Sequence, residues 1–379
     1  MSKSNTYLVV TTFFPSNESF VGSYIFDQLN EIRKHSNLDI ELVKIVSLFS
    51  DETDYFFKDF SVKIFKTIDF PFFIFPGVFN FINKMRFKSF LIKKNIGNIK
   101  FSQSHVSYPS SYLVEDLECN KIIQHHGLDV LQLTNGRNKF MRNIQKRFLI
   151  RNTIKHLNNA DINIGVSNLV LQKLRNYKTY NPQNEFVLYN GVDTSKFFDK
   201  ETTKNDIFTI GCVANFWKIK DQITLIKSTQ KILEDGHKIK LRLIGSGPTL
   251  QSCKKYVFEN NLSKYIIFEE EIAHEKLNDF YNSIDLFVLP SYYEALGCVY
   301  LESWATNTPF IGIEGQGISE LIPKKDRKTF LAKVQSTESL TEKILIAYKD
   351  RKSYPFISRY DIKNTISNFL LLNIFKKYD

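Results

Sequence analysis

Glu294 and Glu302 stand eight positions apart, on either side of Gly297, in the segment PSYYEALGCVYLESWATNTPFIGIEGQGISELI, residues 290–322. From Cys298 onward the apolar residues repeat with a helical period. Carboxylates accept hydrogen bonds from hydroxyl groups, and the amides that begin a helix attract phosphate oxygens. The first glutamate suits hydroxyls of a sugar, and the second, about one turn into the helix, suits the two hydroxyls of a ribose.

The position of this segment in the chain makes the pattern specific. Two glutamates at this spacing are otherwise common on solvated helices. The apolar stretch DLFVLP, residues 285–290, comes directly before and predicts a buried strand. Ligands of open α/β domains bind outside the carboxyl ends of such strands. We therefore expect the amides of Gly297, Cys298 and Val299 to lie at a helix N-terminus and to hold a diphosphate.

Alternating strand and helix patterns in the first half of the chain predict the scaffold of one domain. A helical repeat covers residues 23–35. Short apolar runs predict strands at 6–14, 38–48, 99–104, 121–125, 162–166 and 185–189. Strands separated by helices indicate a parallel sheet with both faces covered.

The second half repeats this pattern. We expect helices from 221 to about 234, from the SGP turn to about 260, near 274–283 and at about 298–306. The strands expected between them are 208–214, 240–245, 265–269, 285–290 and 309–313. The polar, turn-rich stretch 190–206 is the expected linker. At 379 residues the chain fits two α/β domains, 1–195 and 196–355.

The segment that contains the two glutamates resembles the E-x7-E segment of retaining glycosyltransferases of family 4. Further stretches are similar to that family: HHGLD, YNGVDTSKF, IGCVANFWKIKD, LIGSGP and YNSIDLFVLPS, at 125–129, 189–197, 210–221, 243–248 and 281–291. The run GQGI at 315–318 resembles members that build bacterial surface polysaccharides, such as capsule, lipopolysaccharide or exopolysaccharide. The resemblance implies a GT-B fold of two Rossmann-like, doubly wound parallel-sheet domains facing a cleft.

The resemblance also implies roles for single residues. Glu302 would bind the donor ribose, Glu294 the donor sugar, and Lys220 the departing diphosphate of a UDP- or GDP-linked sugar. Where the family often has an arginine, five residues before the lysine, this chain has Asn215, which removes one cation from the phosphate site. Outside this context, Lys220 would be interpreted as an ordinary loop lysine.

Three more residues of the first half match family positions. His126 follows the strand 121–125 and would form hydrogen bonds with the sugar or the acceptor near the bond being broken. Asp129 would orient the same loop. Gly22 matches the glycine loop behind the first strand, where acceptor and donor phosphates meet. Without the resemblance, a histidine here would be a structural cap and the glycine a device that starts a helix.

The chain has no Asp-x-Asp and no clustered His and Asp, so we expect neither a metal nor a cofactor. Lys220 and the helix amides would then stabilise the leaving group, as preorganised positive groups do. The resemblance implies retention of the anomeric configuration, usually described as front-face attack. No carboxylate in the sequence clearly fits the nucleophile of a double displacement.

Charge is unevenly distributed along the chain. The net charge is +11, and residues 1–195 hold 24 Lys and Arg against 17 Asp and Glu. The stretches 84–100 and 137–155 contain cations, apolar residues and no acids. They fit an anionic membrane surface, because many relatives act on lipid-linked acceptors, although two solvated helix faces would give the same pattern. No signal peptide or membrane span is seen, so we expect a cytoplasmic protein, peripheral at the inner face of the plasma membrane.

Two other interpretations stay open from the sequence. The same fold also hosts sugar-nucleotide epimerases and phosphorylases. The positive charge would suit a nucleic-acid-binding protein, but the chain carries no recognised nucleic-acid-binding motif, and we expect no nucleic-acid partner. Residues 356–379 are predicted as a helix that, by the resemblance, packs back on the N-terminal domain.

Overall fold

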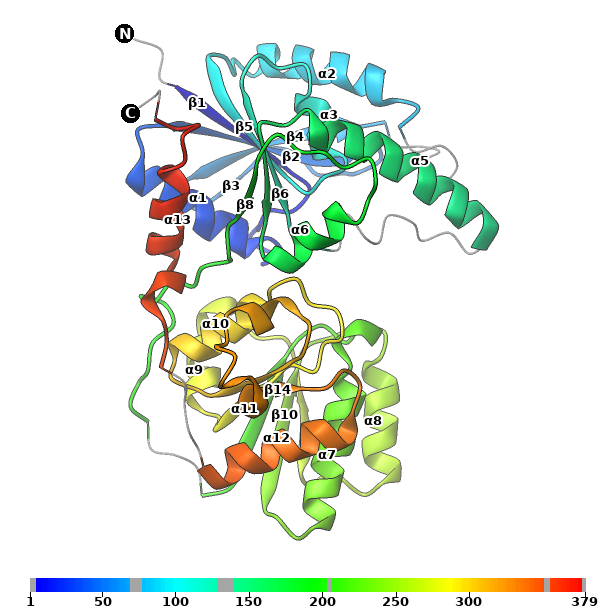
Figure 1. Ribbon diagram of the computed structural model, residues 1–379, viewed down its shortest axis with the longest axis vertical. Coiled ribbons are helices and arrows are strands. Elements are labelled where there is room, and N and C mark those ends of the chain that lie inside the picture. Colours follow the sequence, from blue (N-terminus) through cyan, green and yellow to red (C-terminus); the bar gives the residue numbers. More distant parts are fainter. Residues whose placement is uncertain (1–4, 69–76, 128–138, 203–205, 351–354, 377–379) are drawn as a thin grey trace. The chain divides into compact units, whose positions relative to one another are not determined.

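The structure of the chain is a computed structural model that describes residues 5–68, 77–127, 139–202, 206–350 and 355–376, without the side chains of residues 139–148 (Figure 1). The chain divides into two compact units. The first contains Met1–Tyr189 and Lys363–Asp379, and the second contains Asn190–Ile362. The division falls at the start of the polar stretch 190–206.

The N-terminal unit is built on an eight-stranded sheet in the order β3-β4-β2-β1-β5-β6-β7-β8. Its strands are β1 (Thr6–Thr11), β2 (Asp39–Ser47), β3 (Tyr55–Phe57), β4 (Phe60–Thr67), β5 (Ile99–His105), β6 (Asn120–His125), β7 (Ile162–Gly165) and β8 (Glu185–Val187). All pairs are parallel except β3 with β4. The order reverses direction between β1 and β5, so the loops that follow these two strands are neighbours at the carboxyl edge.

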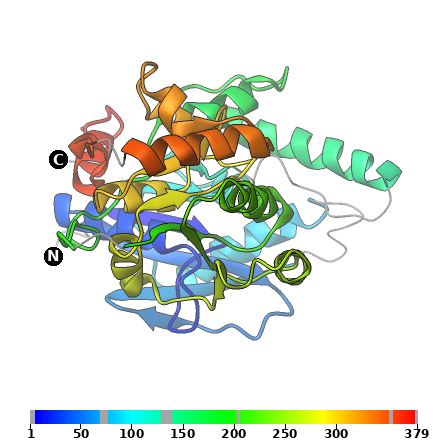
Figure 2. The same cartoon turned by 90° about the horizontal axis from the view of Figure 1, so that it is seen from below.

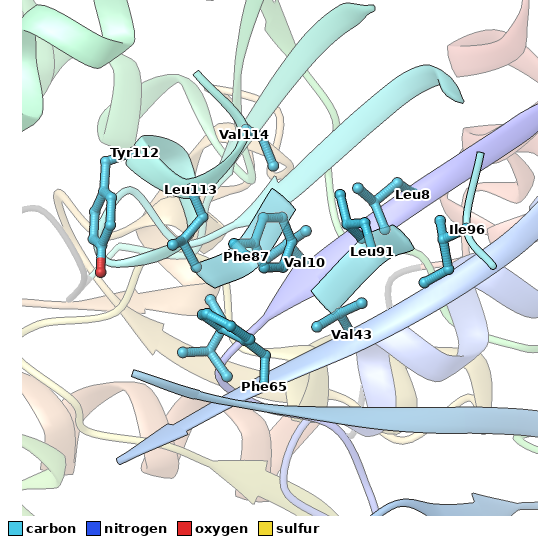
Figure 3. Close-up of a cluster of buried hydrophobic side chains, with 11 residues drawn as sticks. Leu8, Val10, Val43, Phe65, Phe87, Leu91, Ile96, Tyr112, Leu113 and Val114 are labelled. Carbon is cyan, nitrogen blue, oxygen red and sulfur yellow. The ribbon is translucent and has the colours of Figure 1, made fainter. Parts of the chain in front are cut away.

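Helices cover this sheet through apolar contacts. They are α1 (Ser23–His35), α2 (Asn80–Lys93), α3 (Ser110–Val114), α5 (Lys139–Asn158) and α6 (Asn168–Arg175). Figure 3 shows the core under α2, where Phe87 and Leu91 pack among side chains of β1, β2, β4 and α3. Every residue of β1 is buried, as expected for the central strand of a sheet that is covered on both faces.

The C-terminal unit has a six-stranded, wholly parallel sheet in the order β11-β10-β9-β12-β13-β14. Its strands are β9 (Phe208–Val213), β10 (Ile239–Ile244), β11 (Ile266–Glu269), β12 (Leu286–Val288), β13 (Phe310–Ile313) and β14 (Leu331–Ala332). The chain adds β10 and β11 on one side of β9, and then crosses to add β12, β13 and β14 on the other. The switch point lies between β9 and β12.

Its helices are α7 (Gln222–Glu234), α8 (Leu250–Glu259), α9 (Leu277–Asn282), α10 (Cys298–Ala305), α11 (Arg327–Phe330) and α12 (Thr337–Asp350). Four 3-10 turns are also present in the described part of this unit: η1 (Lys218–Lys220), η2 (His274–Lys276), η3 (Gly317–Glu320) and η4 (Ser358–Tyr360). α7 and α12 lie side by side, joined by an ion pair of 2.8 Å between Lys231 Nζ and Glu338 Oε1 (Figure 2).

The sequence prediction of one long helix at residues 356–379 is wrong. Within the predicted stretch 356–379 the helix α13 spans only Ile362–Leu370, and the turn η4 comes before it. After Leu370 the chain turns and buries Phe375, whose ring lies 4.8 Å from that of Phe101. A continuous helix would carry this aromatic ring away from its partners, so tertiary packing ends the helix. No helix in the described ranges is long and apolar enough to span a membrane.

Candidate functional site

The loops that follow β9 and β12 are bound to each other at the switch point of the C-terminal sheet. Ser291 Oγ donates a hydrogen bond of 3.1 Å to the carbonyl oxygen of Ile219, and the amide of Tyr292 donates one of 3.0 Å to the same oxygen. This carbonyl belongs to η1, which also contains Lys220. The loop containing the predicted cation is therefore fixed beside the loop containing Glu294.

Lys220 and Glu294 form an ion pair. Lys220 Nζ lies 2.5 Å from Glu294 Oε2. The two side chains are 23% and 13% exposed, so they are partly shielded from water but still open to a ligand. Two residues separated by 74 positions thus meet as a charged pair, and the structure brings these two predicted site residues into direct contact.

The run GQGI supports the backbone of Glu294. The amide of Glu294 donates to Gln316 Oε1 at 2.8 Å, and the amide of Gly317 donates to the carbonyl oxygen of Glu294 at 3.0 Å. A Cβ atom on Gly317 would lie only 1.5 Å from the carbonyl oxygen of Ala295, so no other residue fits without moving backbone. The sequence resemblance drew attention to this run but did not assign it this role.

Gly297 precedes the first residue of α10 and has an extended conformation, with φ −70° and ψ 119°. Cys298 and Val299 form the first two positions of the helix, as expected from the sequence. The first amides of a helix have no intrahelical carbonyl partner, and the first turn of α10 has no acidic side chain. Asn190 Nδ2 fixes this helix entrance by donating a hydrogen bond of 2.9 Å to the carbonyl oxygen of Leu296.

Glu302 lies in α10 and is buried, with 6% of its surface exposed. Tyr281 Oη donates a hydrogen bond of 2.7 Å to Glu302 Oε2, and His274 Nε2 lies 3.5 Å from Oε1. Burial, and then the charge of Glu302, raise the pKa of Tyr281 well above its ordinary value, so the phenol keeps its proton. Sequence reasoning missed Tyr281 and His274, because each lies in a different element from the carboxylate it contacts.

The loop after β9 also contains Asn215, whose side chain replaces the arginine common in the family. Asn215 is exposed, and its carbonyl oxygen accepts a hydrogen bond of 3.1 Å from Gln222 Nε2. Gly245, with φ +136°, lets the loop after β10 pack on this loop, because a Cβ there would lie 2.3 Å from the carbonyl oxygen of Ala214. Asn215 therefore lies within reach of solvent or a ligand, in the loop that leads to Lys220.

Gly22 and His126 belong to the N-terminal unit. Gly22 precedes α1 with φ +89°, and a Cβ there would lie 2.9 Å from the carbonyl carbon of Phe13, so the turn requires glycine. Tyr24, in the first turn of α1, has its ring 4.9 Å from that of His126. The structure thus brings the turn containing Gly22 and the histidine together through Tyr24.

Asp129 lies outside the described residues. Among the residues that the structure does describe, no group of three or more His, Cys, Asp and Glu is placed to hold a metal ion.

Comparison with known proteins relates one segment of the chain to a known family. Residues 193–364, which include Lys220, Glu294 and Glu302, match the family described as "Glycosyl transferases group 1". The match covers a little less than half of the chain, so it is residues 193–364 that are similar to the group 1 glycosyl transferases. This confirms the resemblance to glycosyltransferases seen in the sequence.

Curated relatives are about a quarter identical to this chain over the parts that align. The O-antigen chain mannosyltransferase RfbU of Salmonella typhimurium is 24% identical over 234 residues, which cover 59% of this chain and 62% of RfbU. Protein CapJ of Staphylococcus aureus is 26% identical over 221 residues, covering 57% and 54%. The capsular polysaccharide biosynthesis glycosyltransferase CapM of the same organism is 29% identical over 168 residues, covering 40% and 43%. The matched part thus spans between 43% and 62% of the length of these relatives.

Solved structures confirm the predicted GT-B fold class. The sucrose-phosphate synthase of Thermosynechococcus elongatus has a TM-score of 0.71 at 16% identity, with 96% of this chain and 94% of that one covered. HepE of Anabaena, solved with UDP and glucose, has a TM-score of 0.71 at 13% identity, with 96% and 98% covered. At this identity the likeness is one of fold.

Proposed function

We propose that this chain transfers a sugar from a nucleoside diphosphate sugar, UDP- or GDP-linked, to a glycan or lipid-linked acceptor in the biosynthesis of bacterial surface polysaccharide. The observation that carries the proposal is the contact between Lys220 and Glu294 in the switch-point loops that lead to α10. The names of RfbU and CapM, an O-antigen chain transferase and a capsule transferase, support the polysaccharide class.

The donor would be held by groups from three elements. The amides at the start of α10, Gly297, Cys298 and Val299, face a diphosphate, and Lys220 adds a positive charge from η1. Glu302 accepts the ribose hydroxyls. Tyr281 fixes only one carboxylate oxygen by its short hydrogen bond. Glu294 accepts hydroxyls of the transferred sugar through its second oxygen, because its Oε2 is bonded to Lys220.

The ion pair has a consequence for catalysis. When the bond between the sugar carbon C1 and the phosphate oxygen breaks, negative charge grows on the leaving diphosphate. Lys220 Nζ has three protons, so it can bind a phosphate oxygen while it keeps Glu294 in place. The positive charge needed at the leaving group would then come from Lys220 and the helix amides, without a metal.

We further propose front-face retention. The acceptor oxygen bonds to C1 on the face from which the diphosphate leaves, and the departing phosphate oxygen takes the acceptor proton. Glu294 is engaged with Lys220, and Glu302 with Tyr281. The proposal thus uses both carboxylates to bind the donor, and it assigns neither as the nucleophile of a double displacement. His126 would form hydrogen bonds with the sugar or the acceptor. Its ring contacts that of Tyr24, two residues after Gly22.

A binding screen with matched variants tests this proposal. Nucleotide sugars with uridine, guanosine or adenosine should raise the Tm of the purified chain for one base class, and donor turnover should accompany it. We expect Glu302→Gln to weaken nucleoside diphosphate binding, and Lys220→Ala to reduce turnover more than binding. Glu259→Gln, an exposed position in α8, is the control for loss of one charge and should change neither.

Unchanged nucleotide affinity in Glu302→Ala would contradict the proposed site. Sugar release that depends on added inorganic phosphate would instead indicate a phosphorylase.

We also propose that α2 binds an anionic membrane surface, and that the protein acts at the cytoplasmic side of the membrane. Opposite its buried face, α2 exposes Phe81, Met85 and Ile92, of which Phe81 and Ile92 are 70% and 76% exposed. The exposed Lys88 and Lys93 lie among them. An apolar face with flanking lysines is the composition of a helix that lies in a membrane interface.

Not all cations of the stretch 84–100 take part in this surface. Lys84 pairs with Glu115 at 3.1 Å and with Asp116 at 3.0 Å, and Lys94 pairs with Asp54. These lysines therefore stabilise the fold. For the second basic stretch, 137–155, the side chains up to residue 148 lie outside the described part.

Liposome flotation tests the membrane surface. Wild-type protein should float with vesicles that contain anionic lipid, and Lys88→Glu with Lys93→Glu should abolish this while donor hydrolysis is unchanged. The exposed pair Lys324→Glu with Lys325→Glu, in the other unit, is the matched charge control and should float as wild type does. Equal flotation of the α2 variant and the wild type would overturn the assignment.

A further inference from the structure

A strip of polar side chains is buried in the N-terminal sheet, at the carboxyl ends of β5 and β6. Gln103 accepts a hydrogen bond of 2.7 Å from Tyr7 Oη, and its amide nitrogen donates one of 2.7 Å to Gln124. His105, the last residue of β5, belongs to this strip and is fully buried. Buried polar groups need partners, so the partners of His105 matter.

Among the described residues, the ring of His105 forms a hydrogen bond with the ring of His126. Nδ1 of His105 lies 3.0 Å from Nε2 of His126, and the two rings are nearly parallel, with 17° between their planes. Nε2 of His105 is buried and has no hydrogen-bond partner among the described residues. Burial, and then the neighbouring His126, hold the pKa of His105 well below its ordinary value, so this ring is neutral.

The backbone fixes His105 in this position. Its carbonyl oxygen accepts a hydrogen bond of 3.1 Å from Ser110 Oγ. The next residue, Val106, has φ +76°, which is unfavourable for a β-branched side chain, and its amide donates a hydrogen bond of 3.0 Å to the carbonyl oxygen of Gln124. Strained backbone of this kind persists where the surrounding structure determines it, and it is common at functional sites.

A hydrogen bond between His105 Nδ1 and His126 Nε2 needs one proton, so one of these two nitrogens donates and the other accepts. If His126 donated it, neutral His105 would carry its own proton on Nε2, where no described group can accept it. A buried N–H without an acceptor is rarer and more unfavourable than a buried acceptor without a donor. The favoured arrangement therefore puts the proton of His105 on Nδ1, which donates to Nε2 of His126.

We propose that His105 is a positioning residue that holds His126 as the tautomer protonated on Nδ1. In that form His126 can only donate a hydrogen bond from Nδ1, because its Nε2 accepts from His105. It would bind an oxygen of the sugar or acceptor and would not remove a proton from it. This role toward substrate depends on the proposed transferase function, whereas the tautomer itself does not.

Two other titratable side chains of the described part lie next to the pair. Tyr24 presents its ring to His126 at 4.9 Å, and His125 points to Asn163, with 3.2 Å between His125 Nε2 and Asn163 Oδ1. The hydrogen bond with His105 is the contact of the His126 ring on which the assignment of the tautomer rests.

Nitrogen NMR of the full-length protein with 15N-labelled histidine tests the inference directly. In the wild type, the ring nitrogens of His126, assigned with His126→Asn, should show a protonated Nδ1 and an unprotonated Nε2. His105→Phe should abolish this preference and lower kcat about tenfold with a smaller change in KM, the usual scale for losing a partner that orients a functional histidine. His105→Asn places an amide N–H near the former Nδ1 and should restore both the tautomer and most of kcat.

Two results would overturn the inference. One is a wild-type His126 protonated on Nε2, and the other is an unchanged tautomer in His105→Phe. Because unfolding would confuse this comparison, the circular dichroism and Tm of both variants are measured, and His105→Asn alone tests the inference if the phenylalanine variant does not fold. A protein that shows the expected tautomer but binds no nucleotide sugar would refute the proposed function and leave the role of His105 intact.

Discussion

At the scale of single residues, the candidate site depends on pairs that lie far apart in the sequence. Lys220 is bonded to Glu294, Tyr281 to Glu302, and His105 to His126. In the first pair both members are predicted site residues, and in the other two a predicted site residue is oriented by a partner that the sequence did not indicate. Residues that only orient a functional side chain can still have a large effect on binding or activity.

Tyr281→Phe tests this at the ribose carboxylate. The variant keeps the ring but removes the hydrogen bond to Glu302 Oε2, and hydrogen bonds to charged groups contribute about 1.5–3 kcal/mol. We expect the Kd for the nucleoside diphosphate to rise about tenfold, which corresponds to about 1.4 kcal/mol. Isothermal titration calorimetry measures it.

Tyr265→Phe provides the control, because Tyr265 is 37% exposed and lies just before β11. An unchanged Kd in Tyr281→Phe would show that Glu302 is held by other groups.

At the scale of elements, the sheet topology places the site. The loops after β9 and β12 are neighbours because their strands flank the switch point, and the loop after β13 supports them through Gln316 and Gly317. Because the strands are parallel, the loops that follow them all lie at the carboxyl edge of the sheet. Hydrogen bonds therefore hold these three loops to one another.

Gly317→Ala tests the close packing between the loops after β12 and β13. The added Cβ would lie 1.5 Å from the carbonyl oxygen of Ala295, so the segment around Glu294 must move. Overpacking of this kind destabilises by about 1–3 kcal/mol. For a unit of this size we expect a fall in Tm of about 4–8 °C, together with a loss of turnover, measured by calorimetry and a donor hydrolysis assay.

Gly97→Ala has no atom within 4 Å of the new Cβ and should leave both properties unchanged. If Gly317→Ala behaved in the same way, the packing of this loop would not matter to the site.

At the scale of the whole molecule, the end of the chain belongs to the first unit. Lys363–Asp379 group with Met1–Tyr189, and the link between Val192 and Asp361 joins the two stretches of chain that pass from one unit to the other. Phe369 and Phe375 pack on each other and on Phe186, Tyr7 and Phe101. The last segment is therefore part of the N-terminal core.

Phe375→Ala tests this contribution. Deletion of a buried phenylalanine ring typically destabilises by about 3–5 kcal/mol, so the unfolding transition of the N-terminal unit should move to lower temperature or denaturant concentration. Leu371→Ala, at a position 70% exposed, is the matched control and should have little effect. A transition unchanged by Phe375→Ala would mean that the segment only rests on the surface.

The sequence by itself predicted most of the strands, because buried parallel strands are continuous apolar runs that can be recognised locally. It missed the strands β3, β4 and β14, which lie at or next to the edges of the two sheets. It also pointed to Glu294, Gly297 and Glu302 as candidates, because they lie in the loop after such a strand or in the first turns of the next helix, while Lys220 was suggested by the family resemblance. The tertiary structure alone decided the partners of these residues, the buried histidine beside His126, and the end of α13. Contacts between residues that are tens of positions apart have no local pattern, because they depend on which strands become neighbours and on which side chains fill the space between them.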